Sequence, residues 1–311
     1  MDRPRRRHLR RLALLAVLMT GVVVLATGTP TASLALVRRT ARAAMKLTTA
    51  GPSRLPSRPA PTSTPTSTPS STPTPAVSSA PPSAPSSAPG PLTVVGLGDS
   101  VPAATDCGCT SYVSLVAQQL ADQQGSTAVV SNLARSGLTT AGLLEQLQDP
   151  SVRVLLGRAD LVLVTIGAND FDGDELTAAA CRPVTGSSCY TDALAGLSRA
   201  LTGVLSQVRQ LQPDSGKVVV TGYWNDFLDG TVGAGQGADY VAASDTLTLA
   251  SNTVTATVSA DQQAQYVDIY TPFKGADGSK DCTWLLADDG DHPNQTGHQV
   301  IAQAILSALT G

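Results

Sequence analysis

The segment ADLVLVTIGAND, residues 159–170, indicates the fold class of the chain. Its centre is continuously apolar, which is typical of a strand covered on both faces of a parallel sheet. Helix-like segments alternate with strands of this kind, and this alternation predicts an α/β fold with helices on both faces of a parallel sheet. The other predicted strands are 92–100, 127–137, 217–225 and 264–273, and the predicted helices are 111–125, 139–149, 190–212, 240–264 and 294–309.

The N-terminal 35 residues have the pattern of a secretory signal peptide. A basic stretch at 5–11 precedes an apolar stretch of 15 residues, Leu12 to Ala26, and a small-residue cleavage site ends at Ala35. We therefore expect a secreted protein. The alternative is a retained signal anchor. It would place the protein at the cell surface and would be its one contact with a membrane. However, 15 apolar residues are few compared with the roughly 20 that a membrane span needs.

The rest of the chain divides into a linker and one domain. Residues 36–90 are rich in Ser, Thr and Pro and cannot form a packed core, so we interpret them as a disordered linker. Residues 91–311 are long enough for a single α/β domain. This domain carries 9 basic and 23 acidic residues, a net charge of −14. So acidic a surface repels nucleic acid and anionic lipid and favours a small or neutral partner.

All five cysteines lie in this domain. In an exported chain their default state is a disulfide. Cys181 and Cys189 flank a short loop and form the best candidate pair. The pairing of Cys107, Cys109 and Cys282 stays open, because one of these three thiols is left over. Zinc is the alternative, but the Cys-Gly-Cys spacing is shorter than zinc sites use.

Ligands of parallel α/β sheets bind beyond the carboxyl ends of the strands. Three of the predicted strand ends are unusual: GDSV at 98–101, ARSG at 134–137 and GAND at 167–170. Neither phosphate-binding glycine motif, GxxxxGK[ST] or GxGxxG, is present at a strand end, and the GxSxG nucleophile elbow is missing. The strand ends therefore carry a different chemistry.

Ser100 is the candidate nucleophile of this set, although a serine there is equally suited to cap a helix. A serine needs an adjacent base, and the domain contains only His292 and His298. His298 falls within a predicted helix, where we expect a solvated or packed side chain. His292 lies in a loop, and Asp289 is spaced to orient its ring as in a catalytic triad. The rival acids are Asp288 and Asp291, of which Asp291 would have to curl back to reach the ring.

An acyl-transfer site also needs hydrogen-bond donors for the oxyanion. Gly137 offers an unobstructed backbone N–H, and Asn169 offers a side-chain amide. Taken alone, Gly137 is as easily a turn glycine and Asn169 an ordinary loop residue. Their value as candidates comes from occurring at strand ends together with Ser100.

The set Ser100, Gly137, Asn169 and His292 resembles the SGNH hydrolase family, also called GDSL esterases and lipases. The blocks GLGDSV, NLARSG, GAND and DDGDHPNQTGH occur in the expected order and span residues 96–298. Val101 replaces the leucine of the family name, and the DCGC insert is less expected. The resemblance implies a flavodoxin-like three-layer sandwich with a five-stranded parallel sheet.

The same resemblance implies ester hydrolysis through an acyl-enzyme, with no cofactor and no metal. By matching position, Ser100 is the nucleophile, His292 the base and Asp289 its partner. The oxyanion donors are the N–H groups of Ser100 and Gly137 and the side chain of Asn169.

The expected protein is thus a secreted carboxylesterase or lipase acting on a small-molecule or glycan ester, and we expect a monomer. The alternatives are an acyltransferase or deacetylase of cell-envelope glycans and, in another class, a non-catalytic binding module. Residues 225–262 are predicted to border the pocket. They are glycine-rich and poor in large apolar side chains, which favours short acyl chains.

Overall fold

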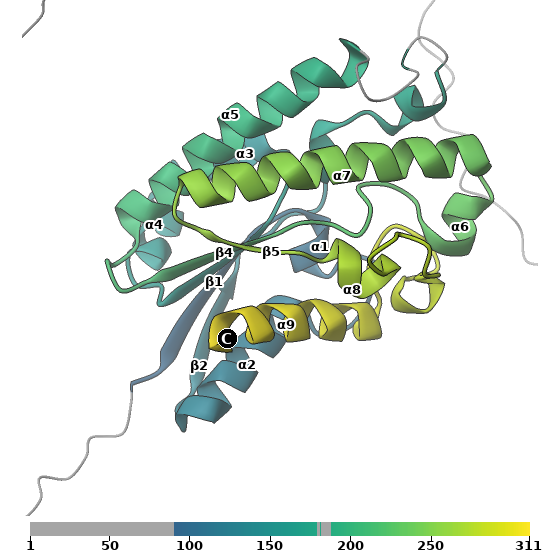
Figure 1. Cartoon of the computed structure of the whole chain (residues 1–311). Helices are drawn as coiled ribbons and strands as arrows, with labels where there is room; N and C mark the ends of the chain where they lie inside the picture. Colours follow the sequence, from purple (N-terminus) through teal and green to yellow (C-terminus); the bar gives the residue numbers. More distant parts are fainter. Residues whose placement is uncertain (1–89, 179–180, 182–187) are drawn as a thin grey trace, which may run out of the picture. The chain divides into compact units, whose positions relative to one another are not determined.

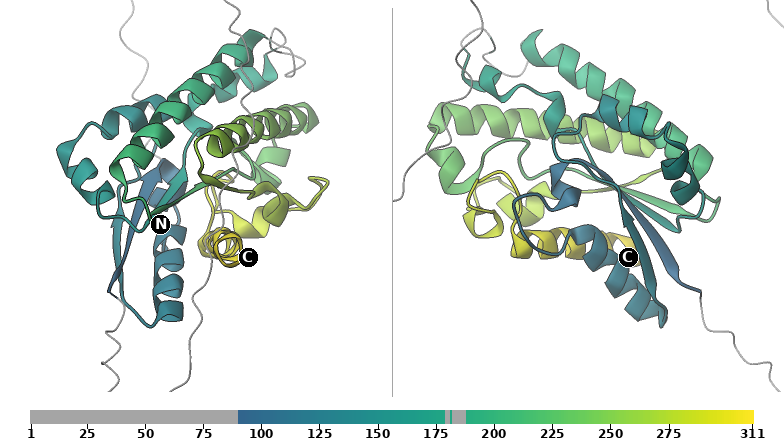
Figure 2. Two further views of the ribbon diagram at one scale, coloured as in Figure 1. Left: turned by 60° about the vertical axis from the view of Figure 1, so that its left-hand side comes forward. Right: turned by 180° about the vertical axis from the view of Figure 1, so that it is seen from behind.

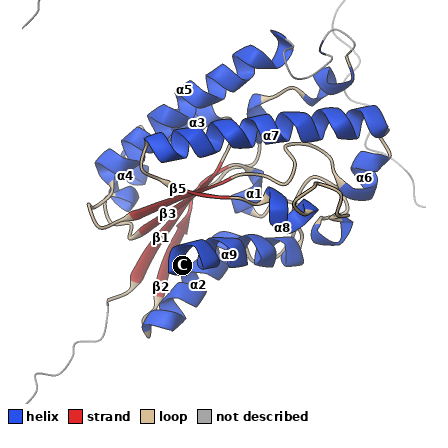
Figure 3. Cartoon of the chain, in the orientation of Figure 1, coloured by secondary structure: helices blue, strands red, loops and turns tan. Residues whose placement is uncertain are grey.

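Five parallel strands form the central sheet of the protein, in the spatial order β2-β1-β3-β4-β5 (Figure 3). This arrangement confirms the predicted five-stranded parallel sheet. Every strand pairs in parallel with its neighbour, so the carboxyl ends of all the strands lie at one edge. The strands are β1 (Leu92–Gly98), β2 (Ala128–Asn132), β3 (Leu161–Thr165), β4 (Lys217–Thr221) and β5 (Gln265–Val267).

The computed structural model describes residues 90–178, 181 and 188–311. The predicted signal peptide and nearly all of the predicted linker lie outside the described residues. Within the described part, no helix combines the length and the apolar character that crossing a membrane requires.

Helices cover both faces of the sheet, as predicted (Figures 1 and 2). On one face α2 and α9 pack side by side, and on the other α5 lies against α3 and α7. The helices are α1 (Ser100–Ala103), α2 (Tyr112–Gln124), α3 (Thr140–Gln146), α4 (Pro150–Leu156), α5 (Ser188–Leu211), α6 (Gly230–Ala234), α7 (Ala238–Asp261), α8 (Tyr270–Lys274) and α9 (Gln295–Thr310), with short 3-10 turns η1 (Ala168–Asp170), η2 (Gly173–Thr177) and η4 (Thr283–Leu285).

The apolar residues of the strands explain this three-layer arrangement. Because side chains alternate between the two faces of a strand, each inner strand supplies both cores. Val94, Leu163 and Val219 pack on the side of α2 and α9. Their neighbours Val95, Val162 and Val220 pack on the side of α3, α4 and α5. The continuous apolar pattern of the strands thus reflects burial on both sides.

The last predicted strand, 264–273, is wrong in its extent. The strand β5 covers only Gln265–Val267, and the helix α8 follows at Tyr270. The carboxylate of Asp268 accepts the backbone N–H of Tyr270 at 2.9 Å, and this local bond competes with strand pairing. The predicted helix at 139–149 is likewise shorter, and a second helix, α4, begins at Pro150 with Asp149 as its N-cap.

Two disulfides occur in the described part of the chain. One joins Cys181 to Cys189, the pair proposed from the sequence. The other joins Cys107 to Cys109, and Cys282 is a buried thiol. The short loop at 107–109 therefore closes on itself, next to the carboxyl end of β1.

Candidate active site

Ser100 lies at the carboxyl end of β1, where the chain turns from strand into helix. The turn needs Gly98, because its φ is +133° and a Cβ there would lie 1.8 Å from the carbonyl oxygen of Thr165. Asp99 caps α1 by accepting the backbone N–H of Val101 at 3.1 Å. Ser100 is therefore the first residue of α1 and not its cap. This geometry leaves the Ser100 side chain at the rim of the sheet.

A buried carboxyl supports the turn from behind. Asp99 is fully buried and accepts a short hydrogen bond from the hydroxyl of Tyr223. Burial raises the pKa of Asp99 to about 7, against the opposing effect of the Tyr223 hydrogen bond. Tyr223 follows β4, so this contact ties the Ser100 turn to a second strand end.

His292 and Asp289 form a close pair in the loop before α9. The Nδ1 atom of His292 lies 2.6 Å from Oδ2 of Asp289. The other oxygen of Asp289 accepts the backbone N–H groups of Asp291 and His292, each at 3.0 Å. A carboxylate bonded in this way fixes the hydrogen on Nδ1 and leaves Nε2 of His292 as the basic atom.

The loop that carries this pair is itself held by hydrogen bonds. Ala287 donates its N–H to the carbonyl of His292 at 2.8 Å. Asn294 caps α9 by accepting the N–H groups of Thr296 and Gly297. Its amide also donates to the carbonyls of Trp284 and Leu286, each at 2.9 Å. The backbone on both sides of His292 is consequently held in place, which helps to position the ring of a base.

Other carboxylates surround the ring of His292 at longer range. Asp291 lies 4.0 Å from Nδ1 and Asp106 lies 3.8 Å from it, whereas Asp288 is exposed. Burial raises the pKa of Asp291. Among these acids, Asp289 alone is within hydrogen-bond distance of the ring. Asp106 was not among the sequence-predicted candidates, because nothing in the sequence places the 104–110 loop against the loop of His292.

The two candidate oxyanion donors follow β2 and β3, the strands on either side of β1. Asn169 donates its side-chain N–H to the carbonyl of Leu138, the residue after Gly137, at 3.2 Å. Asp170 accepts both the backbone N–H and the hydroxyl of Thr140. These contacts join the loop after β2 to the 3-10 turn after β3. They bring Gly137 and Asn169 to the same edge of the sheet as Ser100.

A small cavity of about 50 Å³ lies at this edge. Ser100, Asn169 and His292 all line it, so the cavity brings three of the sequence-predicted residues together. Among the described residues, no hydrogen bond joins the hydroxyl of Ser100 to His292. In enzymes of this kind the bond between nucleophile and base often forms only when substrate binds. The wall consists of Ser100, Val101, Ala168, Asn169, Tyr223, Trp224, Asn225, Asp226, Asp291 and His292.

Larger hollows occur elsewhere, and one of about 590 Å³ lies next to Leu92, Asp160 and Lys217. These residues lie at the amino ends of the strands. Because ligands of open parallel sheets bind at the carboxyl ends, the smaller cavity is the better candidate site.

The residues after β4 were missing from the sequence-based candidates, although the strand-end argument could have found them in GYWND, 222–226. Asp226 is nearly buried and accepts the hydroxyl hydrogen of Ser251 at 2.5 Å. Burial raises its pKa to about 7, and the nearby Asp99 carboxylate adds to the shift. Trp224 stacks on Phe273 at a ring distance of 4.6 Å. This strand end thus supplies a rigid, acidic part of the cavity wall.

Potential metal ligands come together in three groups of the described residues. Two groups contain the disulfide-bonded cysteines, with His298 or Glu175 beside them. A disulfide sulfur is not a thiolate and does not serve as a metal ligand in that state. The third group is Asp106, Asp289 and His292, in which Nδ1 of the ring already contacts Asp289. The geometry around His292 therefore suits an acid–base pair.

Residues 97–300 match the model of the GDSL-like lipase/acylhydrolase family, and the chain belongs to that family. The protein is accordingly a carboxylic ester hydrolase. This finding confirms the resemblance identified in the sequence, the enzyme class and the flavodoxin-like fold that it implies.

Known proteins are similar to this chain at low identity. The uncharacterized protein YpmR of Bacillus subtilis (strain 168) is 24% identical over 229 residues, which cover 70% of this chain and 81% of YpmR. The lipase Lip_vut3 from a goat rumen metagenome has 18% identity and a TM-score of 0.55, and the match covers 71% of this chain and 98% of the lipase. Axe2, an acetylxylan esterase from Geobacillus stearothermophilus, has 19% identity and a TM-score of 0.49, covering 71% and 94%. The lipase shows that the fold is shared.

Proposed function

We propose that the protein is an exported serine esterase in which Ser100 is the nucleophile, His292 the general base and Asp289 the acid that orients the base. The observation that carries this proposal is the 2.6 Å contact between Nδ1 of His292 and Asp289, beside a cavity that Ser100 also lines. A serine, a histidine and a carboxylate with these roles are the parts that acyl transfer requires.

The reaction follows from these roles. Nε2 of His292 takes the hydroxyl proton of Ser100 while Oγ attacks the ester carbonyl carbon. The tetrahedral oxyanion accepts hydrogen bonds from the N–H groups of Ser100 and Gly137 and from the amide of Asn169. The imidazolium then gives its proton to the leaving alcohol. Water, activated by the same histidine, attacks the acyl-enzyme and releases the carboxylic acid and free Ser100.

Two properties of the cavity favour a small acyl group. Its volume of about 50 Å³ is far below the several hundred Å³ of a typical ligand pocket. Asn225, Asp226 and Asp291 make part of its wall polar, and burying polar groups against an alkyl chain without hydrogen bonds is unfavourable. We therefore infer that acetate and other short acyl esters are the substrates.

The same cavity also favours a second candidate, a deacetylase or acyltransferase of cell-envelope glycans, because acetyl is the group that such enzymes move. In both cases the partner is a small-molecule or glycan ester.

Hydrolysis of p-nitrophenyl esters from C2 to C16 by the full chain tests the proposal. Highest kcat/KM at C2 to C4 supports a short-chain esterase, and a maximum at C10 or longer contradicts it. Acetate release from an acetylated polysaccharide, with little turnover of p-nitrophenyl esters, favours the glycan deacetylase. A non-catalytic binding module is the outcome if no ester and no polysaccharide is turned over.

The N-terminal segment supports export. The net charge of −14 on the domain favours a monomer and opposes nucleic-acid binding. N-terminal sequencing of protein recovered from the culture medium tests this part. A start at residue 36 supports cleavage of the signal peptide, whereas an intact N-terminus in the membrane fraction identifies a signal anchor.

A further inference from the structure

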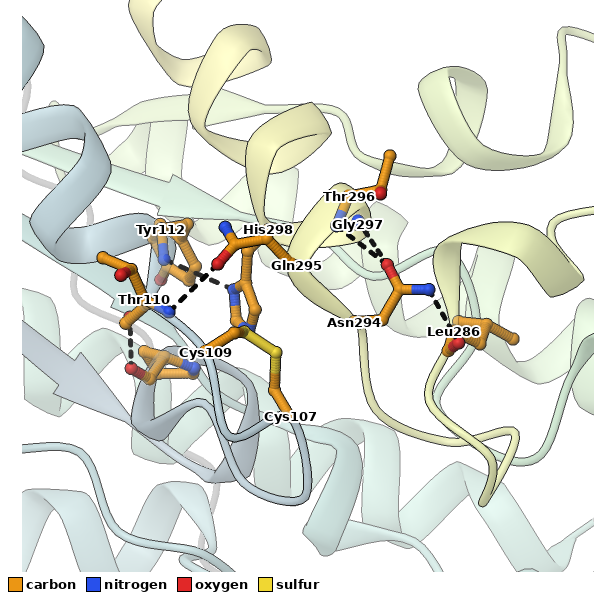
Figure 4. The surroundings of a disulfide bond; sticks show 12 residues. Cys107, Cys109, Thr110, Tyr112, Leu286, Asn294, Gln295, Thr296, Gly297 and His298 are labelled. Atoms are coloured by element: carbon orange, nitrogen blue, oxygen red, sulfur yellow. Dashed lines mark hydrogen bonds between the residues drawn. A yellow bond between two sulfur atoms is a disulfide. The ribbon is translucent and has the colours of Figure 1, made fainter.

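A disulfide between Cys107 and Cys109 lies against the buried ring of His298 (Figure 4). Both cysteines are half-buried and lie in the loop between α1 and α2, and His298 comes from α9. A ring nitrogen of His298 and the two sulfur atoms lie within 4.8 Å of one another. His298 is fully buried, and its Nε2 atom has no hydrogen-bond partner within the described residues. A buried ring nitrogen without a partner is unusual and needs an explanation.

The hydrogen bonds of His298 determine which nitrogen carries the hydrogen. The backbone N–H of Tyr112 donates to Nδ1 of His298 at 3.3 Å, so Nδ1 presents a lone pair. Burial lowers the pKa of His298 to about 4, which keeps the ring neutral. The single hydrogen of a neutral ring then lies on Nε2. This state does not suit a metal ligand, which needs the lone pair of Nε2, but it does suit a donor to sulfur.

We infer that the Cys107–Cys109 disulfide is a site of thiol–disulfide exchange, and that the Nε2–H of His298 stabilises its reduced state. A low-molecular-weight thiol is the reductant. Its thiolate attacks one sulfur, forms a mixed disulfide and expels the other cysteine as a thiolate. A second thiol molecule attacks the mixed disulfide, so the protein gains two thiols while two reductant molecules become one disulfide. Since a disulfide sulfur is a weak acceptor and a thiolate a strong one, Nε2–H favours the reduced product.

The exchange site is connected to the candidate active site at both ends of its loop. Asp106, next to Cys107, lies 3.8 Å from Nδ1 of His292. Thr110, next to Cys109, donates its N–H to the side chain of Gln295 at 3.2 Å, and Gln295 is only three residues beyond His292. Reduction of the disulfide therefore loosens a loop that packs against the general base. This effect on catalysis rests on the proposed function, whereas the exchange itself does not.

The backbone of the loop supports the same effect. Ala104 and Asp106 have φ values of 56° and 55°, in the left-handed region that residues other than glycine rarely adopt. The disulfide closes the chain directly after these residues. Once it is cut, they are free to leave this conformation, and Asp106 moves relative to His292.

The exchange equilibrium is measured on the full chain without substrate. The protein is equilibrated at about pH 8 with graded ratios of reduced to oxidised dithiothreitol, alkylated and analysed by peptide mass spectrometry. The amide of His298→Asn retains an acceptor near the position of Nδ1 but lacks the N–H at the position of Nε2. The longer amide of His298→Gln places an N–H near the position of Nε2. We expect the ratio of dithiol to disulfide at 107 and 109 to fall about tenfold in His298→Asn and to stay close to wild type in His298→Gln.

Equal reduction of wild type and His298→Asn, or a Cys107–Cys109 bond that no ratio of dithiothreitol reduces, overturns the inference. A variant without the two cysteines, C107A/C109A, keeps the test independent of whether the His298 variants fold. We expect dithiothreitol to lower kcat/KM for p-nitrophenyl acetate severalfold in wild type and to have no effect in C107A/C109A. A loss of activity that persists in this variant assigns the effect to Cys181–Cys189 and contradicts the coupling. If the protein turns over no ester, the proposed function fails while the mass measurement still decides the exchange site.

Discussion

Asp289 holds His292 through both of its carboxylate oxygens. One oxygen contacts Nδ1 of the ring at 2.6 Å, and the other accepts the backbone N–H of the same histidine at 3.0 Å. The pKa of Asp289 is lowered overall. Burial alone would raise this pKa, but the hydrogen bonds from the ring and from the backbone of Asp291 and His292 outweigh it. Asp289 is thus ionised at neutral pH and fixes both the ring orientation and the tautomer.

Asp289→Asn is expected to lower kcat by about 10³-fold or more, because an amide no longer selects the tautomer with the hydrogen on Nδ1. Steady-state kinetics on p-nitrophenyl acetate measures the loss. Asp288→Asn, an exposed neighbour in the same loop, is the matched control and should retain wild-type activity. A larger loss in Asp291→Asn than in Asp289→Asn would show that the orienting acid has been assigned wrongly.

Asn169→Asp is expected to lower kcat by about 10²–10³-fold with little change in KM, since the lost N–H acts on the oxyanion of the transition state. The substitution keeps the size of the side chain, but its carboxylate also repels the oxyanion and the carbonyl oxygen of Leu138, which now accepts the Asn169 amide. The loss in kcat is therefore an upper limit for the contribution of the N–H. The measurement is again kcat and KM on a short-chain ester. A rise in KM at constant kcat would instead assign Asn169 to substrate binding.

Gly137→Ala is expected to destabilise the fold by about 1 kcal/mol and to lower kcat. Gly137 has a φ of +76°, and a Cβ would meet nothing within 4 Å. The penalty is therefore backbone strain and not a clash. Gly137→Asn is the control, because asparagine tolerates this conformation better. Urea unfolding compares the two variants, and equal destabilisation by both would argue against strain as the cause.

As the pH rises from 5 to 8, the free energy of unfolding of the wild type is expected to fall, whereas that of Asp226→Asn should not show this fall. Burial raises the pKa of Asp226 from 3.8 to about 7. Between these values the folded state binds more protons than the unfolded state, so wild-type stability falls as the pH rises. Above pH 7 the full pKa shift of Asp226 lowers the free energy of unfolding of the wild type by at most about 4 kcal/mol.

Urea unfolding at pH 5 and pH 8 measures this difference, with Asp288→Asn as the exposed control. The asparagine does not ionise and can still accept the hydrogen of Ser251, which now bonds to Asp226. A stability difference between Asp226→Asn and wild type that is the same at both pH values would mean that Asp226 is not the titrating group.

The position of Ser100, Gly137 and Asn169 was predictable from the sequence because each follows an apolar strand. In a parallel sheet, residues at the carboxyl ends of successive strands come to one edge whatever their separation in sequence. His292 was found by elimination, because the domain has only two histidines.

Contacts between loops could not be predicted in this way. Nothing in the sequence brings His298 to the Cys107–Cys109 loop or Asp106 to His292, because these contacts depend on how α2 and α9 pack side by side. The α8 helix was mistaken for strand because YVDIYTPF, 266–273, is rich in β-branched and aromatic residues. The hydrogen bond that Asp268 accepts from the backbone N–H of Tyr270 favours the helical conformation. Tyr223 and Asp226 belong to no recognised motif, although they follow β4 as the other candidates follow their strands. The structure places Tyr223 against Asp99 and both residues in the cavity wall.

The assignment of Ser100 as nucleophile is tested most directly by covalent labelling with a fluorophosphonate, followed by peptide mass spectrometry and an assay of p-nitrophenyl acetate hydrolysis. We predict one equivalent of label on Ser100, complete loss of activity in the labelled protein, and neither labelling nor activity in a folded Ser100→Ala variant. Label on another serine, or full activity retained by Ser100→Ala, would contradict the account.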